Sequence, residues 1–478
     1  MTDKLWYGDN LNILRSMPPA SVDLIYLDPP YNSKRDYNCS FGSVAQSKAF
    51  KDTWTWGPDD DENIEAVIER NPILGAFLLS LDGMLPKRGL YPYLVNMAVR
   101  LVEMHRVLKD TGSIYLHVDP TASHYLKLVM DQIFGGGNFR NEIVWCYSNS
   151  GRTTKAFASK HDILLAYGKS EKATWTDYRI PVSQKYLDSH YRQTDHEGRR
   201  CRIRVDAGKE RIYYPDAGMI CNDWWDDIAS LNSVANERLG YPTQKPLALL
   251  ERIIQASSNE GDVVLDPYMG SGTTIEAAAK HGRKFIGIDV THHAVATAVG
   301  RLEECGIHLD KHQIIGIPED TASARKLKTD SPRQFDAWCV LQSGAQCHDD
   351  GDRIVGLRNF PSISKGKEHL RRAMYMATND DPPTMADIKM AEARMKKLSC
   401  EIGFLFCFEM PEDPAVLQHV TKRAPYTDDL RSIPSLQLIT MRDLIHGNSA
   451  ANLISEWRQR RLRDLSRQME LARQMELV

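Results

Sequence analysis

The sequence predicts an α/β protein, with a mainly parallel sheet interrupted by an inserted region and followed by a further α/β domain. The first observation is a set of short β-branched runs with the composition of buried parallel strands. These runs are Val22–Leu27, Ser113–Val118, Val263–Leu265 and Lys284–Ile288. The second observation is that the stretches between these runs carry apolar residues at helical spacing. Strands and helices in alternation indicate a Rossmann-like sheet.

Three helices are expected from their spacing and their ends. Tyr93–Leu108 and Pro246–Ala256 carry apolar residues three and four apart, and the proline suits the first turn of the second helix. A third helix follows Gly272 and is expected to end at Gly282, because glycine commonly closes a helix.

Changes in local composition and residue pattern divide the chain into five expected segments. In the second segment, mixed short strands with many aromatic and basic residues replace the alternation of strands and helices. This change indicates an insertion suited to target recognition. After about His312 the alternation starts again, and the chain ends in a charge-rich amphipathic helix. The expected boundaries are 1–137 and 237–312 for the two parts of the sheet domain, 138–236 for the insertion, 313–450 for an accessory domain and 451–478 for the terminal helix.

Composition bounds the class of protein. The 478 residues are enough for two or three domains that each bury a core. A net charge of -3 gives no overall basic signature of nucleic-acid binding, so such contacts have to come from local patches. Nine cysteines without a CxxC pair or a Cys/His cluster favour reduced thiols, and no metal site is expected. Without a signal peptide or a membrane-spanning run, we expect a cytoplasmic protein with no membrane partner.

The first chemical signal is Asp28-Pro29-Pro30-Tyr31, directly after the run that ends at Leu27. Ligands of open α/β sheets bind outside the carboxyl ends of strands, where Asp28 stands. Asp28 can accept one hydrogen of an exocyclic amino group while the rigid Pro29 carbonyl accepts the other, which aims the nitrogen lone pair at a methyl sulfonium. Tyr31 would stack on a base flipped out of a duplex. The alternative is that the two prolines only end a strand.

The second signal is a strand that runs into a glycine turn and a helix, with the sequence VVLDPYMGSGTT at 263–274. Gly270 and Gly272 allow the backbone to approach a ligand, and the helix N-terminus favours a carboxylate such as that of a methionine moiety. The turn completes neither GxGxxG nor a phosphate-binding loop, which disfavours a nicotinamide enzyme. One helix downstream, Asp289 ends the next strand, where it can hold ribose hydroxyls or cap a helix.

These residues resemble the amino-methyltransferases of DNA in the permuted motif order called the beta class, in which DPPY precedes the glycine motif. YGDN at 7–10 and YPTQKP at 241–246 look like two further elements of that family, and the resemblance covers Leu5 to about Arg301. It implies S-adenosylmethionine as the cofactor and Asp28, Pro29, Pro30 and Tyr31 as catalytic residues. The implied cofactor-binding residues are Asp9, Asn10, Asp28, Thr243, Lys245, Asp266, Pro267, Tyr268, Gly270, Ser271, Gly272, Thr273 and Asp289.

The order of the motifs favours double-stranded DNA as the substrate, since the resembling RNA and protein-glutamine methyltransferases carry PPY after the glycine motif. In the family that the sequence resembles, Asp rather than Ser at position 28 implies N6 of adenine as the target, with N4 of cytosine as the alternative. A catalytically silent DNA-binding subunit is a second alternative, disfavoured by the intact DPPY and GSG motifs. The partners implied are DNA and a cognate restriction or defence protein.

Phosphate contacts need cationic side chains, and the insertion holds a cluster of them. The candidate DNA-binding residues are Arg152, Lys155, Arg199, Arg200, Arg202 and Arg204. The alternative for each is a solvated surface charge. Trp224 and Trp225 are expected in the core rather than in base stacking.

The C-terminal third resembles, more faintly, a nuclease-like domain fused to some relatives of these methyltransferases. Val355 stands at the metal-binding Asp position and Lys365 at the downstream Lys position, so an inactive module is expected rather than a bifunctional restriction enzyme. The duplicated SRQMEL and ARQMEL segments of the terminal helix fit either a homodimer contact or a solvated helix.

Overall fold

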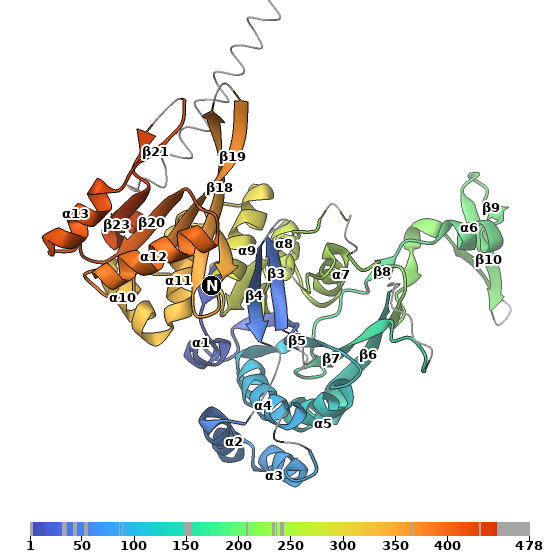
Figure 1. Ribbon diagram of the computed structural model, residues 1–478. Coiled ribbons are helices and arrows are strands. Elements are labelled where there is room, and N and C mark those ends of the chain that lie inside the picture. Colours follow the sequence, from blue (N-terminus) through green and yellow to red (C-terminus); the bar gives the residue numbers. More distant parts are fainter. Residues whose placement is uncertain are drawn as a thin grey trace, which may run out of the picture.

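A sheet domain, a second α/β domain and a projecting hairpin segment make up the computed structural model (Figure 1). Tyr31, Arg152, Lys365 and the terminal helix at 451–478, all named above, lie outside the residues that the structure describes. The described residues are 3–30, 36–41, 45–51, 56–85, 87, 89–147, 155–206, 209–231, 235, 237–239, 243–364, 367–429 and 432–446.

The main sheet has nine strands in the order β13-β6-β7-β5-β2-β14-β15-β1-β16. The four expected strands are confirmed as its centre and are parallel, while β7 runs antiparallel to β5 and β6. All six residues of β2 are buried because the sheet is covered on both faces. The strands are β1 (Lys4–Tyr7), β2 (Val22–Leu27), β5 (Leu108–Val118), β6 (Phe139–Cys146), β7 (His161–Gly168), β13 (Trp224–Trp225), β14 (Val263–Asp266), β15 (Lys284–Asp289) and β16 (Ile314–Ile315).

Helices cover the two faces of this sheet in separate layers. One apolar cluster joins α1, α3, α4 and α5 to one face, and a second joins α7, α8 and α9 to the other. The three helices expected from the sequence are confirmed as α4, α7 and α8, with ends shifted by a few residues. The helices are α1 (Asn10–Ser16), α2 (Pro58–Arg70), α3 (Pro72–Leu81), α4 (Leu90–Val107), α5 (Ser123–Phe134), α7 (Leu247–Ser257), α8 (Thr273–Lys280) and α9 (His292–Glu304).

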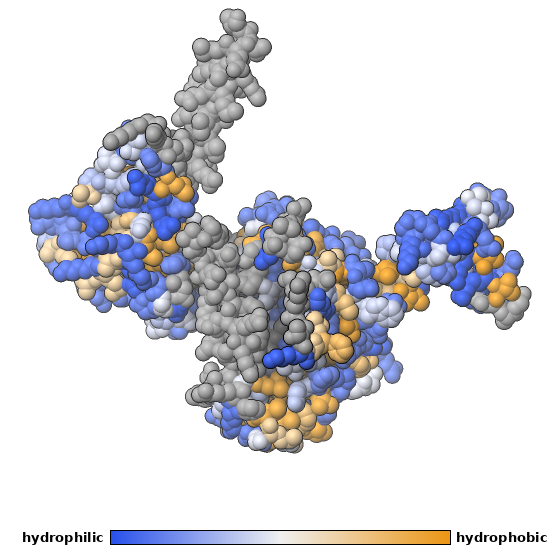
Figure 2. Space-filling view, turned by 45° about the vertical axis from the view of Figure 1, so that its right-hand side comes forward, coloured by the Kyte–Doolittle hydropathy of each residue, from blue (hydrophilic) through white to orange (hydrophobic). Residues whose placement is uncertain are grey.

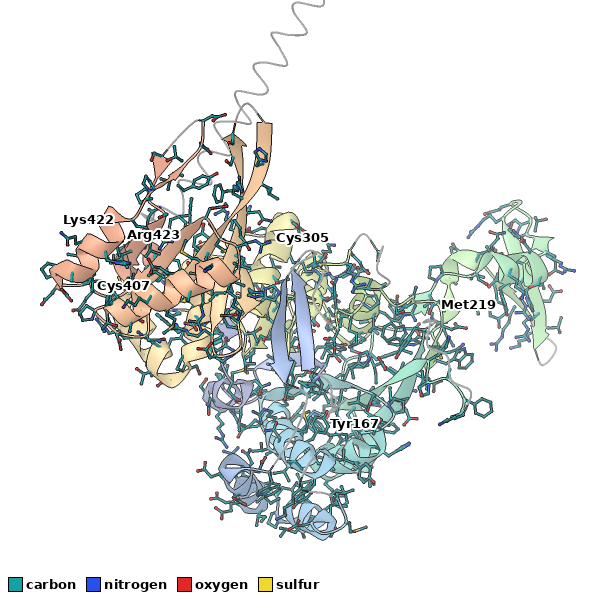
Figure 3. The ribbon with its side chains drawn as sticks, in the orientation of Figure 1. Tyr167, Met219, Cys305, Cys407, Lys422 and Arg423 are labelled. Carbon is teal, nitrogen blue, oxygen red and sulfur yellow. The ribbon has the colours of Figure 1, made fainter. Side chains whose placement is uncertain are left out.

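The segment 138–236, expected to be an insertion, contributes three strands to the main sheet. β6 and β7 form long antiparallel pairings there, and β13 pairs with β6 through the buried Trp225 and the exposed Trp224. The projecting part is shorter than expected and is joined through a two-stranded pair that includes Met219, labelled in Figure 3. It consists of β8 (Arg179–Ile180), α6 (Gln184–His190), β9 (Gln193–Thr194), β10 (Arg200–Asp206), β11 (Lys209–Tyr213) and β12 (Met219–Ile220).

The second domain is built on a five-stranded sheet in the order β17-β18-β19-β20-β23. Its first three strands are antiparallel, and β20 and β23 then run parallel to β19. β16 still belongs to the main sheet, so the second domain begins after 315 rather than at 313. Its elements are α10 (Thr321–Asp330), α11 (Pro332–Gln342), β17 (Gln346–Asp349), β18 (Ile354–Ser364), β19 (Lys367–Ala377), α12 (Met385–Lys397), β20 (Ile402–Cys407), α13 (Pro414–Lys422), β21 (Tyr426–Thr427), β22 (Ser432–Ile433), β23 (Leu436–Thr440) and α14 (Met441–Ile445).

The surface carries a further hairpin and an exposed apolar patch. A hairpin of β3 (Asp36–Phe41) and β4 (Ala45–Lys51) lies beside β17. Figure 2 shows apolar side chains gathered at the foot of the molecule, where Figure 1 places α3 and α5. The exposed apolar residues of these two helices are Ile73, Leu79 and Leu128. The described cysteines, Cys305 and Cys407 of Figure 3 among them, form no disulfide with one another. None of the described helices combines the length and apolar character needed to cross a bilayer.

Candidate active site

One cavity of about 420 Å³ lies at the carboxyl ends of β2, β14 and β15. This volume is typical of a small-molecule site, and the position is where open α/β sheets bind their ligands. It is lined by Asp9, Asn10, Tyr26, Asp28, Pro29, Pro30, Asn96, Arg100, Thr243, Gln244, Lys245, Leu250, Asp266, Pro267, Tyr268, Met269, Gly270, Ser271, Thr273, Thr274, Asp289, Val290, Thr291 and Gln334.

The carboxylate of Asp28 forms one end of the cavity. It follows the buried strand β2, and its side chain is only 13% exposed. Lys245, 217 residues further along the chain, forms an ion pair with it and is itself nearly buried. Thr243, two residues before Lys245, has a positive φ of 61°, a conformation that β-branched residues rarely adopt. Such backbone strain is typical of sites that hold a side chain in place.

The glycine turn after β14 supplies the middle of the cavity wall. Gly270 has φ of 48° and Gly272 has φ of 78°, which glycine adopts without a steric penalty. Ser271 and Thr273 line the cavity, whereas Gly272 does not. Gly272 is the N-cap of α8, and a Cβ there would lie 2.7 Å from the Cβ of Ala298 in α9. The small size of Gly272 lets α8 pack against α9, and a contact between Gly272 and the ligand stays a prediction.

Asp266, at the end of β14, is the most deeply buried carboxylate of the cavity. It is 2% exposed and accepts hydrogen bonds from Thr274 Oγ1 at 2.5 Å and from the Tyr268 amide at 3.0 Å. Burial raises the pKa of Asp266 to about 7, and the nearby charges of Asp28 and Asp289 act in the same direction. The free protein therefore carries a carboxyl group that titrates near neutral pH.

Asp289 ends the neighbouring strand β15. Its Oδ2 accepts from the Gly270 amide at 3.1 Å, and its Oδ1 accepts from the amide and hydroxyl of Thr291 at 2.9 Å. The N-cap of α9 is Thr291, so Asp289 is not the helix cap that the sequence left open. Burial raises the pKa of Asp289 as well. His292 begins α9 as expected, and burial lowers its pKa to about 3, which keeps the ring neutral.

A buried arginine that the sequence analysis did not single out organises the third side of the cavity. Arg100 of α4 is 8% exposed and donates to Asp9 Oδ2 at 2.9 Å and to Asn10 Oδ1 at 2.7 Å. Asn10 in turn donates to the Pro267 carbonyl at 2.8 Å. An arginine inside the apolar stripe of a helix was the available signal, since buried charges are nearly always paired.

The expected site residues thus converge with few exceptions. Every cofactor-binding candidate except Gly272 lines the one cavity, as do Pro29 and Pro30. The basic candidates lie apart from it: Arg199, Arg200 and Arg204 sit at or near the projecting β10–β11 hairpin (Figure 1), and Lys155 is exposed after β6. Within the described ranges, no group of His, Cys, Asp and Glu could hold a metal ion.

A Rossmann-like sheet with acidic strand ends and a glycine turn around one cavity defines an enzyme that binds a nucleoside-type ligand. A family model described as "DNA methylase" matches residues 22–300. Because that match spans more than half of the 478 residues, the chain belongs to the DNA methylase family.

Two curated relatives each match 62% of the chain. Type II methyltransferase M.EcaI of Enterobacter cloacae is 27% identical over 346 residues, covering 62% of this chain and 68% of its own length. DNA adenine methyltransferase YhdJ of Escherichia coli (strain K12) is 30% identical over 299 residues, covering 62% and 81%. Among solved structures, PvuII DNA methyltransferase (cytosine-N4-specific) covers 70% of this chain and 93% of its own at 16% identity, with a TM-score of 0.37.

Proposed function

We propose that this chain transfers a methyl group from S-adenosylmethionine to N6 of an adenine flipped out of double-stranded DNA. The observation that carries the proposal is the convergence of Asp28, Asp266, Asp289 and the glycine turn on one cavity. Membership of the DNA methylase family and a relative named as an adenine methyltransferase support it. Asp at position 28 favours adenine over cytosine-N4.

The residues of the cavity fit the proposed cofactor. S-adenosylmethionine is a cation at its sulfonium and amino groups, and four carboxylates line the cavity: Asp9, Asp28, Asp266 and Asp289. The α8 N-terminus, with Ser271 and Thr273, suits its carboxylate. Asp289 would hold the ribose hydroxyls. When bound, the cofactor supplies an electrophilic methyl group.

The chain's own residues contribute orientation and proton acceptance. Asp28 and the Pro29 carbonyl would each accept one hydrogen of the target amino group, which fixes the direction of its lone pair. Lys245 holds the Asp28 carboxylate in place by an ion pair. The positive charge that develops on the nitrogen is stabilised by Asp28. Tyr31 is proposed to stack on the base.

The test is to incubate the protein with unmethylated plasmid DNA and radiolabelled S-adenosylmethionine and to identify the labelled nucleoside. Label in N6-methyladenine is expected. Label in N4-methylcytosine would keep the mechanism and change the base. Absence of label despite measured cofactor binding would favour the silent DNA-binding subunit.

Cofactor affinity is expected to depend on pH through Asp266. With a pKa of about 7, Asp266 is mainly protonated at pH 6 and ionised at pH 8. The stability of the fold has its own pH dependence: because folding raises the pKa of Asp266, its contribution to stability is present below the unfolded pKa and is lost as the pH rises through 7.

Cofactor affinity changes in the opposite direction. A cationic ligand prefers the ionised carboxylate, so S-adenosylmethionine should bind about tenfold more tightly at pH 8 than at pH 6. Calorimetry in buffers of different ionisation enthalpy should show that cofactor binding releases a proton. Asp266→Asn should abolish the pH dependence of the affinity and the proton release.

We propose the β10–β11 hairpin as the DNA contact. Arg199, Arg200 and Arg202 already have partners in Asp216, Asp188 and Tyr186, respectively. Arg204 and Arg211 stand opposite each other on the two strands, both exposed, and neither forms an ion pair with any other described residue. Two such cations on one face of a hairpin suit phosphate groups.

The double variant Arg204→Ala/Arg211→Ala is expected to weaken DNA binding alike for all sequences. Each lost phosphate contact should reduce the slope of log K against log salt by about 1, and kcat at saturating DNA should stay near wild type. Fluorescence anisotropy at several salt concentrations measures this. The control Lys389→Ala/Lys396→Ala removes two exposed charges from α12. Equal slopes for the two variants would show a general charge effect and contradict a contact at the hairpin.

We propose that the second domain is a nuclease-like module without cleavage activity. Its sheet has three antiparallel strands, which are followed along the chain by a helix and a parallel strand. Val355 is fully buried in an apolar cluster with Met374 and Met376, and Asp336 is held by Arg353. We expect no cleavage of plasmid DNA in the presence of Mg²⁺ or Mn²⁺. Cleavage by the wild-type protein that is lost in Lys365→Ala would contradict this proposal.

A homodimer and a cognate restriction or defence protein remain proposed partners.

A further inference from the structure

The wall of the cavity includes one residue from the second domain. Gln334, in the first turn of α11, lines the cavity together with Asp289, Val290 and Thr291. α11 packs against α9, the helix that begins directly after Thr291. The family match ends at residue 300, so Gln334 lies outside it.

α11 is a rigid support for this side chain. Phe335 and Trp338 are each 1% exposed in the core of the second domain, and Asp336 forms a buried ion pair with Arg353. Arg333 donates to the Gly351 carbonyl at 2.6 Å. Gln334 itself is half-buried, and its amide makes no hydrogen bond to any other described residue. A polar group positioned by its neighbours and left without a partner is available to a ligand.

The order of the strands indicates which part of the cofactor lies near Gln334. Asp28 and Asp289 end β2 and β15, which are separated by β14, so they lie roughly 10 Å apart at about 4.8 Å per strand. With the methyl group delivered at Asp28, the adenosine belongs at Asp289 and Val290. Adenine offers an amino donor next to a ring-nitrogen acceptor, and a glutamine amide offers the complementary pair.

We propose that Gln334 hydrogen-bonds the adenine of S-adenosylmethionine, so that the second domain completes the cofactor site. This inference rests on the proposed function. It makes the second domain part of the methyltransferase rather than an independent module. β17 lies beside β4 in the hairpin that follows the catalytic tetrapeptide, which is a second contact between the same domain and the site region.

Gln334→Met tests the inference because methionine has a similar size and lacks both hydrogen-bonding groups. Titration calorimetry with S-adenosylhomocysteine should show about tenfold weaker binding, as expected for one or two neutral hydrogen bonds. Binding of 5′-methylthioadenosine, which keeps the adenine and lacks the amino acid, should weaken by the same factor. In methylation assays, KM for the cofactor should rise while kcat at saturation stays unchanged.

The matched control is Gln342→Met, which changes an exposed glutamine at the other end of the same helix. Equal affinities for Gln334→Met and Gln342→Met would overturn the inference, as would a lower kcat with unchanged affinity. Failure of the wild-type chain to bind S-adenosylhomocysteine would instead overturn the proposed function, so the two failures are distinguishable.

Discussion

Asp28→Ala is expected to lower the rate of DNA methylation by at least about 1000-fold, from the loss of a positioned proton acceptor and of charge stabilisation together. The carboxylate is the group that both orients the target amine and offsets the positive charge on its nitrogen. Cofactor affinity should be largely kept, since Asp266, Asp289 and the glycine turn remain in place. Single-turnover methylation and calorimetric binding of S-adenosylhomocysteine measure the two effects separately.

The chain offers a matched control for this variant. Asp119 also ends a parallel strand, β5, and also precedes a proline, but it lies outside the cavity and accepts hydrogen bonds from Thr121 and Ala122 at 3.1 Å. Asp119→Ala should lose about 1 kcal/mol of stability with these two hydrogen bonds and keep its activity. Retained turnover in Asp28→Ala would eliminate the proposed mechanism. Comparable loss in both variants would point to damage to the fold.

Sequence patterns predicted the strand-end carboxylates well for a physical reason. Asp28, Asp266 and Asp289 each follow a short apolar run, and parallel strands bring their carboxyl ends to one edge of the sheet. Local sequence therefore determines both the type of each residue and its place.

What the sequence could not predict depends on contacts between distant segments. Arg100 and Gln334 enter the cavity from α4 and α11, and their place there depends on how these helices pack in the fold. The sequence places β6 in an insertion because mixed short strands with many aromatic and basic residues begin close to its start. Its place in the sheet is fixed by pairing with β7, which is a tertiary effect.

Gly272 shows the same limit, and it leads to the second large prediction. The atom nearest to a Cβ added at Gly272 belongs to Ala298, 26 residues away, and the local sequence does not reveal this contact. Gly272→Ala should destabilise the protein by about 2 to 5 kcal/mol, combining a left-handed conformation with overlap in a packed helix contact. Movement of the α8 N-terminus should also weaken cofactor binding, because Ser271 and Thr273 flank the substituted residue.

Two further variants separate the strain from the overlap. Gly261 also has a positive φ, 85°, but an added Cβ would meet nothing within 4 Å, so Gly261→Ala should cost only about 1 to 2 kcal/mol in urea unfolding. In the double variant Gly272→Ala/Ala298→Gly, removal of the Ala298 methyl should recover part of the loss, although glycine within α9 costs about 1 kcal/mol by itself. A double-mutant cycle with strictly additive effects would show that Gly272 is required for its backbone conformation alone. A favourable coupling energy would assign it to the contact between α8 and α9 that holds the cofactor wall in place.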